Sequence, residues 1–365
     1  MTNDNTPSID EKTLDKLIES KTRMGYENKS WDKWFDYILD PQNGDNETKY
    51  EKYMKSYFYD NLYEKSVKNF SINLQDVWNE RSANDVLDNI SSENRPNSAI
   101  VIGRGPSLKK YKHLQLLSES NYKGAIICSD GILATALENG ITPDRFSNFF
   151  VITVDADNII KEYYNHEKIS EYGPKIKGLF STVTDPETVN EARKRKIGIH
   201  WFHSLFDLDE GEKSFNKISA LMVRSKRHKK GLPGLQTGGN VGTTCWFAAW
   251  RILKCNTACL IGIDHSWAED DSLDVITTHG KPEHKFEINY TQNDFDKLFP
   301  KIHNPFFDCT CILDPIFQYY SNGLKEFIAR SPSNLQTINA TEGGCIFGDR
   351  INCMKFSEFL QKNDK

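Results

Sequence analysis

The chain has 365 residues, which is more than one small domain needs and suits two unequal domains. Hydrophobic residues make up 38% of it and aromatic residues 12%, a composition that excludes an intrinsically disordered protein. The formal net charge of −5 lacks the basic excess of general nucleic-acid-binding proteins, so we expect no nucleic-acid partner.

The sequence predicts a cytoplasmic location. Its first residues lack the basic stretch and following apolar run that mark a signal peptide. No apolar stretch approaches the roughly 18 residues that cross a bilayer, so we expect no membrane span. The eight cysteines form no disulfide framework of the kind found in small secreted domains. The chain is compatible with a homo-oligomer, but no pattern indicates one.

Residues 1–95 differ from the rest of the chain in charge and pattern. They hold 13 Lys/Arg and 19 Asp/Glu, and aromatic residues recur at three- and four-residue intervals from Trp31 to Tyr63. This spacing predicts amphipathic helices with an aromatic face. We therefore predict a helical N-terminal region over 1–95 and a catalytic domain over 96–365. The helices either brace that domain or form a separate partner-binding module.

From residue 98 onwards, short apolar runs alternate with helical stretches, and a turn bearing glycine or aspartate follows most runs. Such strands are typical of a mostly parallel sheet covered on both faces, so the predicted fold class is α/β and Rossmann-like. Ligands of these sheets bind outside the carboxyl ends of the strands, where the polar residues of this chain gather. The predicted strands are Ser98–Ile102, Ala125–Cys128, Phe149–Val154, Gly178–Val183, Ile197–Phe202, Cys259–Ile263 and Leu335–Asn339.

The first candidate loop is Gly103-Arg104-Gly105-Pro106-Ser107, between a predicted strand and a predicted helix. Its glycines permit a tight turn and close approach of backbone N–H groups to a phosphate. Pro106 suits the first helical position, and Ser107 offers a hydroxyl and an N–H. The loop is neither the dinucleotide fingerprint, whose third glycine is missing, nor a Walker A loop. A tight turn without a ligand is the alternative interpretation.

A second glycine-rich loop precedes the strongly helical stretch Cys245–Lys254. A loop of this kind directs N–H groups and the partial positive charge of a helix N-terminus at one point. Its candidate phosphate-binding residues are Thr237, Gly238, Gly239, Asn240, Gly242 and Thr243.

A basic run lies just upstream, with five Lys or Arg in the seven residues 224–230. Beside the glycine-rich loop, this run is predicted either to close over phosphates, with Arg227 as a contact, or to form a solvated surface loop.

Asp155 and Asp157 follow a β-branched strand. Two carboxylates two residues apart at a strand end suit Mg²⁺ or Mn²⁺ held against a diphosphate. We therefore predict a metal site at Asp155 and Asp157; ribose binding, or a chance match of so short a motif, are the alternatives.

Asp130 and Asp264 end two other apolar runs and are candidate catalytic residues in the same cleft, although each could instead cap a helix. His265 stands beside Asp264 and is a candidate general base or phosphate ligand.

Taken together, these motifs resemble the MptE-like family, named for the archaeal 6-hydroxymethylpterin diphosphokinase. The resemblance covers roughly residues 98–267, and six elements in the right order are far more specific than any one of them. The elements are Gly103–Leu108, Cys128–Gly131, Asn139–Asp144, Val154–Asp157, Gly238–Gly242 and Gly262–Ser266.

The resemblance implies a transferase that moves a diphosphate from ATP, with Mg²⁺, to the hydroxymethyl group of a reduced pterin and releases AMP. The same domain type is similar to motif-accessory-factor glycosyltransferases and a bacterial sialyltransferase family, which use a CMP-sugar donor. The segment Asn339–Gly344 is similar to the ending of that branch. A nucleotide-binding adaptor without catalysis is a third hypothesis.

Overall fold

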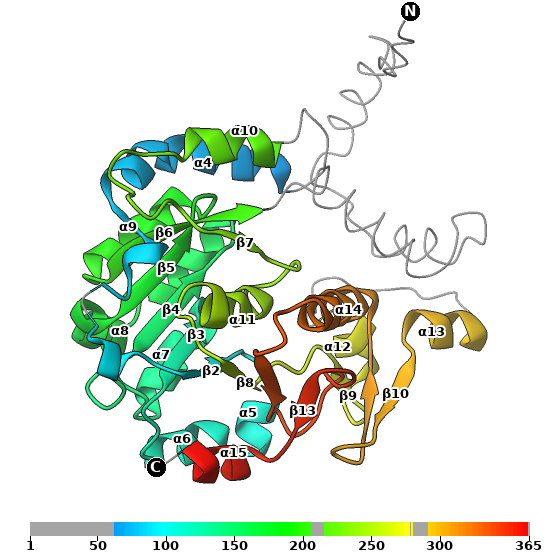
Figure 1. Ribbon diagram of the computed structural model, residues 1–365. Coiled ribbons are helices and arrows are strands. Elements are labelled where there is room, and N and C mark those ends of the chain that lie inside the picture. Colours follow the sequence, from blue (N-terminus) through cyan, green and yellow to red (C-terminus); the bar gives the residue numbers. More distant parts are fainter. Residues whose placement is uncertain (1–61, 89, 206–214, 278, 280–290, 364–365) are drawn as a thin grey trace, which may run out of the picture.

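The computed structural model describes residues 62–88, 90–205, 215–277, 279 and 291–363 (Figure 1). Most of the predicted helical N-terminal region, including Trp31 and Trp34, lies outside these residues. Of that region, the structure describes helix α4, Tyr63–Asn79, and a short strand after it. The boundary at residue 95 stays a prediction.

One large sheet organises the described residues, and every strand pair in it is parallel. Its order is β1-β6-β5-β4-β3-β2-β8-β12-β13, with β7 also paired to β6. The α/β, mostly parallel fold predicted from the sequence is therefore confirmed. The strands are β1 Arg81–Ser82, β2 Ser98–Ile102, β3 Ala125–Ser129, β4 Phe149–Thr153, β5 Lys177–Ser181, β6 Gly198–Leu205, β7 Gly234–Gln236, β8 Thr257–Ile261, β12 Gln336–Asn339 and β13 Ile351–Cys353.

Helices cover both faces of this sheet because both faces of its strands are apolar (Figure 1). In β2, Ile100 and Ile102 join one hydrophobic cluster, whereas Ala99 and Val101 join the other. The first cluster includes residues of α4, α5 Ser107–Lys110, α6 His113–Glu119, α7 Leu133–Glu138, α8 Glu167–Tyr172, α9 Pro186–Lys194 and α15 Phe356–Asn363. The second includes residues of α11 Val241–Arg251 and α14 Pro315–Ala329.

The strand order reverses between β2 and β8. From β2 the chain adds β3, β4, β5 and β6 in one direction, and it later adds β8, β12 and β13 on the other side. Loops that leave two neighbouring strands toward opposite sides open a crevice at their carboxyl ends, and ligands of open α/β sheets bind there. The loops at residues 103–107 and 262–267 leave the sheet at this reversal.

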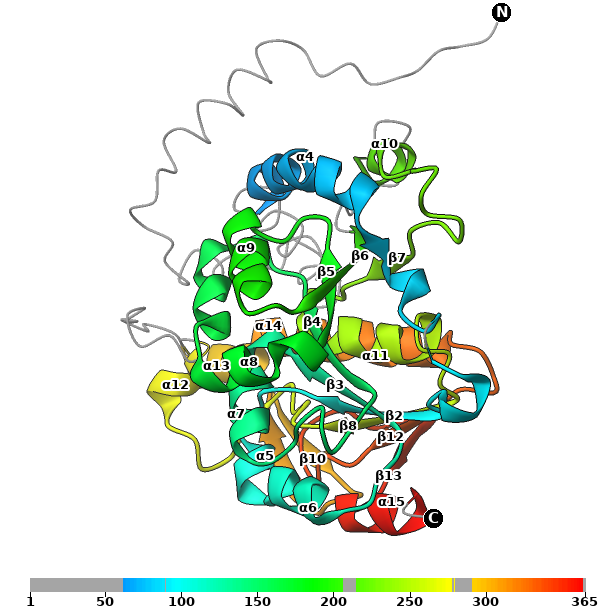
Figure 2. The same cartoon turned by 90° about the vertical axis from the view of Figure 1, so that its left-hand side faces the viewer.

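Helix α4 lies across the carboxyl ends of β4 and β5 (Figure 2). Its buried Asn69 and Asn73 each donate two hydrogen bonds from the side-chain amide. The acceptors are backbone carbonyl oxygens in the loops after these strands, those of Ala156, Thr182, Val183 and Thr184. These contacts place the helix over the ends of β4 and β5, which are two and three strands away from β2.

A smaller antiparallel sheet, in the order β10-β11-β9, follows the main sheet in the chain. No helix of the described residues is long and apolar enough to span a membrane. The remaining elements are β9 Trp267–Ala268, β10 Lys301–Asn304, β11 Cys309–Ile312, α10 Phe215–Met222, α12 Leu273–Thr277, α13 Gln292–Leu298, and the 3-10 helices η2 Ala83–Asp85, η3 Ser92–Asn94, η4 Asp130–Ile132, η5 Asn158–Tyr164 and η6 Gly173–Lys175.

Candidate functional site

Two positions after β2 must be glycine because the segment after β8 leaves no room for a side chain there. A Cβ added at Gly103 would lie 2.2 Å from the carbonyl oxygen of Gly262. A Cβ added at Gly105 would lie 1.7 Å from Asp264 Oδ2. The amides of these two glycines donate to the carbonyl oxygens of Ile261 and Gly262, both at 2.9 Å. They are therefore engaged within the protein, and a phosphate would depend on the other groups of the loop.

Asp264 stands at the start of α5. Its Oδ2 accepts a hydrogen bond of 2.8 Å from the hydroxyl of Ser107, the first residue of that helix, while Pro106 is the N-cap. Burial raises the pKa of the Asp264 carboxyl to about 6, and the Ser107 hydrogen bonds oppose the rise. The carboxylate of Asp264 thus occupies the helix start that the sequence suggested for a phosphate.

Ile263 brings the two glycine-rich loops together. Its Cδ1 would lie 2.4 Å from a Cβ at Gly103 and 2.8 Å from one at Gly242. The start of α11 therefore adjoins the loop after β2, as the clustering of motifs at strand ends predicted.

Helix α11 begins at Val241, earlier than the predicted Cys245, and Asn240 caps it. Asn240 Oδ1 accepts from the Thr243 amide at 2.8 Å, and its Nδ2 donates to the Gly238 carbonyl at 3.2 Å. The amides of Val241 and Gly242 have no partner in the part of the chain that the structure describes. Open N–H groups at a helix N-terminus attract anions.

Arg104 and Asp130 lie at the carboxyl ends of β2 and β3. The Arg104 guanidinium lies 5.3 Å from the centre of the Tyr163 ring and donates to the Tyr163 hydroxyl at 3.0 Å. Burial raises the pKa of Asp130, which is 6% exposed, to about 7. The Gly131 amide, 2.8 Å from Asp130 Oδ1, opposes the rise, and the Asp155 carboxylate adds to it.

Asp155 and Asp157 follow β4, as predicted, but they have different partners. Asp157 Oδ1 lies 3.1 Å from Lys65 Nζ of α4, so its charge is already balanced. Asp155 Oδ1 accepts the Asp157 amide at 2.9 Å. The pKa of Asp155 is raised, first by desolvation from the atoms around its carboxyl group although the residue as a whole is exposed, and further by Asp157. Within the described ranges, no three His, Cys, Asp or Glu side chains gather as a metal site.

His265 is buried, with 8% of its surface exposed and a backbone φ of +44°. Its ring lies between Phe317, 6.3 Å away, and Tyr320, 5.9 Å away, and its Nδ1 has no partner among the described residues. Burial, aided by the charge of Lys325, lowers the pKa of His265 to about 3. The imidazole is therefore neutral at physiological pH and a weak base.

The basic run 224–230 attaches to the segment after α4. The Ser225 hydroxyl donates to the Trp78 carbonyl at 2.9 Å, His228 Nε2 donates to the Glu80 carbonyl at 3.0 Å, and Lys230 pairs with Asp88. These contacts hold the run beside β1 and do not join it to the glycine-rich loop. Closure of Arg227 over phosphates stays a prediction.

Two aromatic residues of α14 belong to the site and were missed from the sequence. A Cβ at Gly239, whose φ is +81°, would lie 2.6 Å from Tyr320 Cε1 and 3.0 Å from Tyr319 Cε1. The tyrosines stand some 80 positions along the chain from that glycine. The only sequence signal for these tyrosines is their spacing on an amphipathic helix. That spacing is as typical of core packing as of a binding site.

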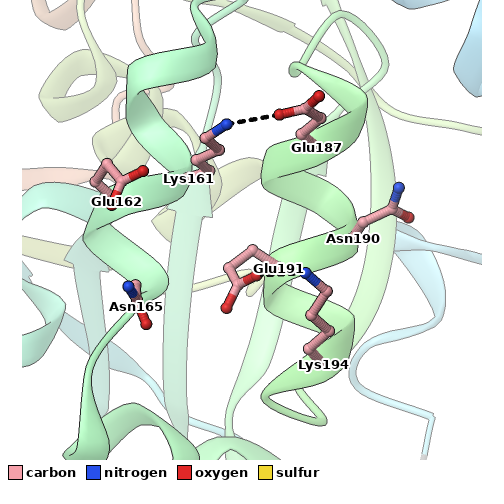
Figure 3. A pocket seen from close by; sticks show the side chains of 7 residues that line it. All are labelled: Lys161, Glu162, Asn165, Glu187, Asn190, Glu191 and Lys194. Atoms are coloured by element: carbon pink, nitrogen blue, oxygen red, sulfur yellow. Dashed lines mark hydrogen bonds and ion pairs between the residues drawn. The ribbon is translucent and has the colours of Figure 1, made fainter.

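A polar groove of about 420 Å³ lies between η5 and α9 (Figure 3). Its side chains carry charges of both signs, and Lys161 Nζ lies 2.7 Å from Glu187 Oε2. The groove contains none of the predicted site residues, and its two Lys and three Glu leave no positive excess that would bind a phosphate. The lining residues are Lys161, Glu162, Asn165, Glu187, Asn190, Glu191 and Lys194.

Comparison with known proteins adds three findings. A 6-hydroxymethyl-7,8-dihydropterin pyrophosphokinase of Methanocaldococcus jannaschii is 33% identical over 104 residues, which cover 24% of this chain and 40% of the relative. The chain therefore spans less than half of that relative's length. The MAf glycosyltransferase from Magnetospirillum magneticum AMB-1 has a TM-score of 0.47 and 15% identity, covering 73% of this chain and 36% of that one. A likeness this distant supports no functional conclusion. Residues 68–270 match the family described as 6-hydroxymethylpterin diphosphokinase MptE-like, and the chain belongs to this family.

Proposed function

We propose that the protein is a nucleotide-dependent transferase that moves a diphosphate from ATP, with Mg²⁺, to a hydroxymethyl-pterin-like acceptor. One observation supports the proposal: the glycine-rich loop after β2 and the segment after β8 pack together where the strand order reverses, and the start of α11 adjoins them. Family membership and the printed activity of the archaeal relative support the reaction class.

The phosphates would bind at the N-terminus of α11, beside Arg104. The open amides of Val241 and Gly242 and the helix dipole attract an anion there, and the exposed guanidinium of Arg104 adds a full positive charge. Diphosphate transfer is catalysed mainly by positioning and charge neutralisation, which these groups supply.

Asp130 and Asp155 are the carboxylates best suited to hold Mg²⁺. The charge of Asp155 adds to the raised pKa of Asp130, so the two carboxyl groups interact, and a cation held between them would relieve this repulsion. Asp157, the second ligand predicted from the sequence, is paired with Lys65 instead. Mg²⁺ commonly takes only one or two protein carboxylates and completes its shell with phosphates and water, so two suffice. When bound, the ion neutralises charge on the phosphates.

The experiment is titration calorimetry of ATP with Mg²⁺ and with EDTA, followed by an assay of AMP release with 6-hydroxymethyl-7,8-dihydropterin. We expect Asp155→Asn to weaken ATP binding about tenfold, or 1.4 kcal/mol, in Mg²⁺ and to change it little in EDTA. Asp144→Asn is the matched control, because Asp144 is an exposed aspartate paired with Lys175.

Three outcomes decide between the hypotheses. AMP release that needs Mg²⁺ and the pterin supports the diphosphokinase. Equal ATP affinity and turnover with and without Mg²⁺ contradicts it and favours a CMP-sugar donor, tested in the same assay with CMP as the binding probe. Tight nucleotide binding without turnover of any donor favours the adaptor.

A further inference from the structure

A tyrosine that the sequence did not single out contacts the arginine of the first glycine-rich loop. The guanidinium carbon of Arg104 lies 5.3 Å from the centre of the Tyr163 ring, and Nη1 of Arg104 donates to the Tyr163 hydroxyl at 3.0 Å. The ring and the hydroxyl contact the same guanidinium, so together they restrict both its position and its orientation.

Gly131 allows these two side chains to pack together. A Cβ added at this glycine would lie 3.3 Å from Arg104 Cδ and 3.4 Å from Tyr163 Cε2. Arg104 follows β2, Gly131 follows β3, and Tyr163 lies in η5 after β4. These three strands are neighbours in the sheet, so the contact joins the loops at their carboxyl ends, starting from the loop at the strand-order reversal.

The next residue along the chain anchors the short helix that carries Tyr163. Tyr164 is fully buried, and its hydroxyl shares a hydrogen bond of 2.5 Å with Thr153 Oγ1. Thr153 is the last residue of β4, so η5 is fixed to the sheet. Tyr163 itself is half-buried. A half-buried ring on an anchored backbone gives the Arg104 side chain a firm support.

Arg104 keeps most of its donors for a ligand. The residue is exposed, and among the described residues no carboxylate lies within ion-pair distance of its guanidinium. Its charge is nevertheless close enough to Asp130 to oppose the rise in the pKa of that carboxyl. A guanidinium has five N–H groups, and the Tyr163 hydroxyl accepts from one nitrogen, so a phosphate can still accept two hydrogen bonds. The contact with Tyr163 therefore holds the guanidinium apart from Asp130 and open to an anion.

We propose that Tyr163 is a positioning residue that presents Arg104 to the phosphates of the nucleotide. This inference rests on the proposed function, in which Arg104 contacts those phosphates. Without Tyr163, the long side chain of Arg104 must be ordered each time a ligand binds, and that ordering weakens the affinity. With Tyr163 in place, the guanidinium is already oriented. The same preorganisation assists transfer, because a charge that is in place beforehand stabilises the transferring group without rearrangement.

The first test is a double-mutant cycle, measured by titration calorimetry with inorganic pyrophosphate in EDTA. We expect Tyr163→Leu to weaken binding about fivefold, since ordering one long side chain costs roughly two- to tenfold in affinity. Tyr163→Phe keeps the ring and loses only the hydroxyl, so it should weaken binding about twofold. In an Arg104→Gln background, Tyr163→Leu should have no further effect. Additive losses, or no binding of pyrophosphate to the wild type, would overturn the proposal.

The matched control is Tyr172→Leu in α8. Tyr172 is another half-buried tyrosine beside a cation, since Lys168 Nζ lies 5.9 Å from the centre of its ring. Its loss should leave the affinity for pyrophosphate unchanged, because neither residue belongs to the loops after β2 and β8. An equal loss of affinity in the Tyr163 and Tyr172 variants would show a general effect on the fold and would refute a positioning role.

The second test needs no ligand, so failure of this proposal and failure of the proposed function are distinguishable. Nitrogen-15 NMR follows the Nε–H group of Arg104, identified from the signal lost in Arg104→Gln. This signal should change its chemical shift in Tyr163→Leu, because the aromatic ring is gone, and should change little in Tyr172→Leu. An unchanged signal in Tyr163→Leu would refute the contact. A shifted signal with a non-additive cycle supports the positioning role even if ATP and a pterin yield no AMP.

Discussion

Asp130 makes stability depend on pH. Its pKa in the folded protein is raised by burial to about 7, above the ordinary value of 3.8 that applies to the unfolded chain. Between these values the folded state binds more protons, so stability is greatest at low pH and falls as pH rises toward 7. As the pH rises from 5 to 6.5, ionisation of this carboxyl should lower the free energy of unfolding by about 2 kcal/mol.

The measurement is thermal or urea unfolding of the wild type and Asp130→Asn across this range. The variant should lose less stability on going from pH 5 to 6.5, because an amide does not titrate and keeps the contact with the Gly131 amide. Parallel curves for the two proteins would show that Asp130 is ionised throughout.

Gly105 matters for the stability of the fold, and not only for binding of a ligand. A methyl group there would overlap Asp264 Oδ2, which the fold cannot move cheaply because Ser107 holds it. We expect Gly105→Ala to lower the free energy of unfolding by about 2 kcal/mol, as overpacking does. Gly343→Ala is the control, since a Cβ there meets nothing within 4 Å. Equal urea midpoints for both variants would contradict this account.

At the level of elements, helix α4 depends on its two buried asparagines. Removing the amide of Asn73 leaves two carbonyl oxygens, 3.1 and 2.8 Å away, without their donor. We expect Asn73→Ala to destabilise the protein by about 2 kcal/mol, since buried groups left unsatisfied cost 1–3 kcal/mol each. Asn79→Ala, in the exposed last turn of the same helix, should change stability by less than about 0.5 kcal/mol. Urea denaturation compares the two, and similar losses would show that α4 is held by its apolar face alone.

The elements of the sheet could be predicted closely because their signal is local. The run Ser98–Ile102 coincides with β2, and the other predicted strands differ from the observed ones by one to three residues at their ends. Continuous Ile, Val and Phe between glycine and aspartate turns identifies a doubly covered strand without reference to any partner.

Side-chain partners could not be predicted, because long-range packing decides them. Asp157 has an ion-pair partner, Lys65, that stands 92 positions earlier in the chain, and its role as a metal ligand stays a prediction. Asp264 looked catalytic, yet it also holds Ser107 at the start of α5. His279 belongs to no motif, and its partner Asp314 stands 35 positions later in the chain. The sequence therefore predicted which residues follow the strands, but it could not predict the side-chain pairs that they form.

At the scale of the whole molecule, helix α4 packs against the main sheet, and strand β1 is part of that sheet. Phe70, Leu74 and Val77 of α4 belong to a hydrophobic cluster that includes residues of the main sheet, and β1 pairs with β6. We expect a chain that begins at residue 96 to lose soluble expression, or to have a Tm that is lower by several degrees. The reason is that removal of three buried apolar side chains exposes the apolar surface that they cover. A chain that begins at residue 62 is the control, and equal Tm values for the two would show that α4 is dispensable.

The position of α4 also has a consequence for synthesis. The helix is made before any strand of the main sheet, yet its contacts are with loops after β4 and β5 and with His203 of β6. At about 5–20 residues per second, the ribosome needs on the order of ten seconds between finishing α4 and finishing β6. During that interval the apolar face of α4, with Phe70, Leu74 and Val77, lacks part of the native surface that covers it. The contacts of α4 with these strand ends can therefore form only after the middle of the chain has emerged.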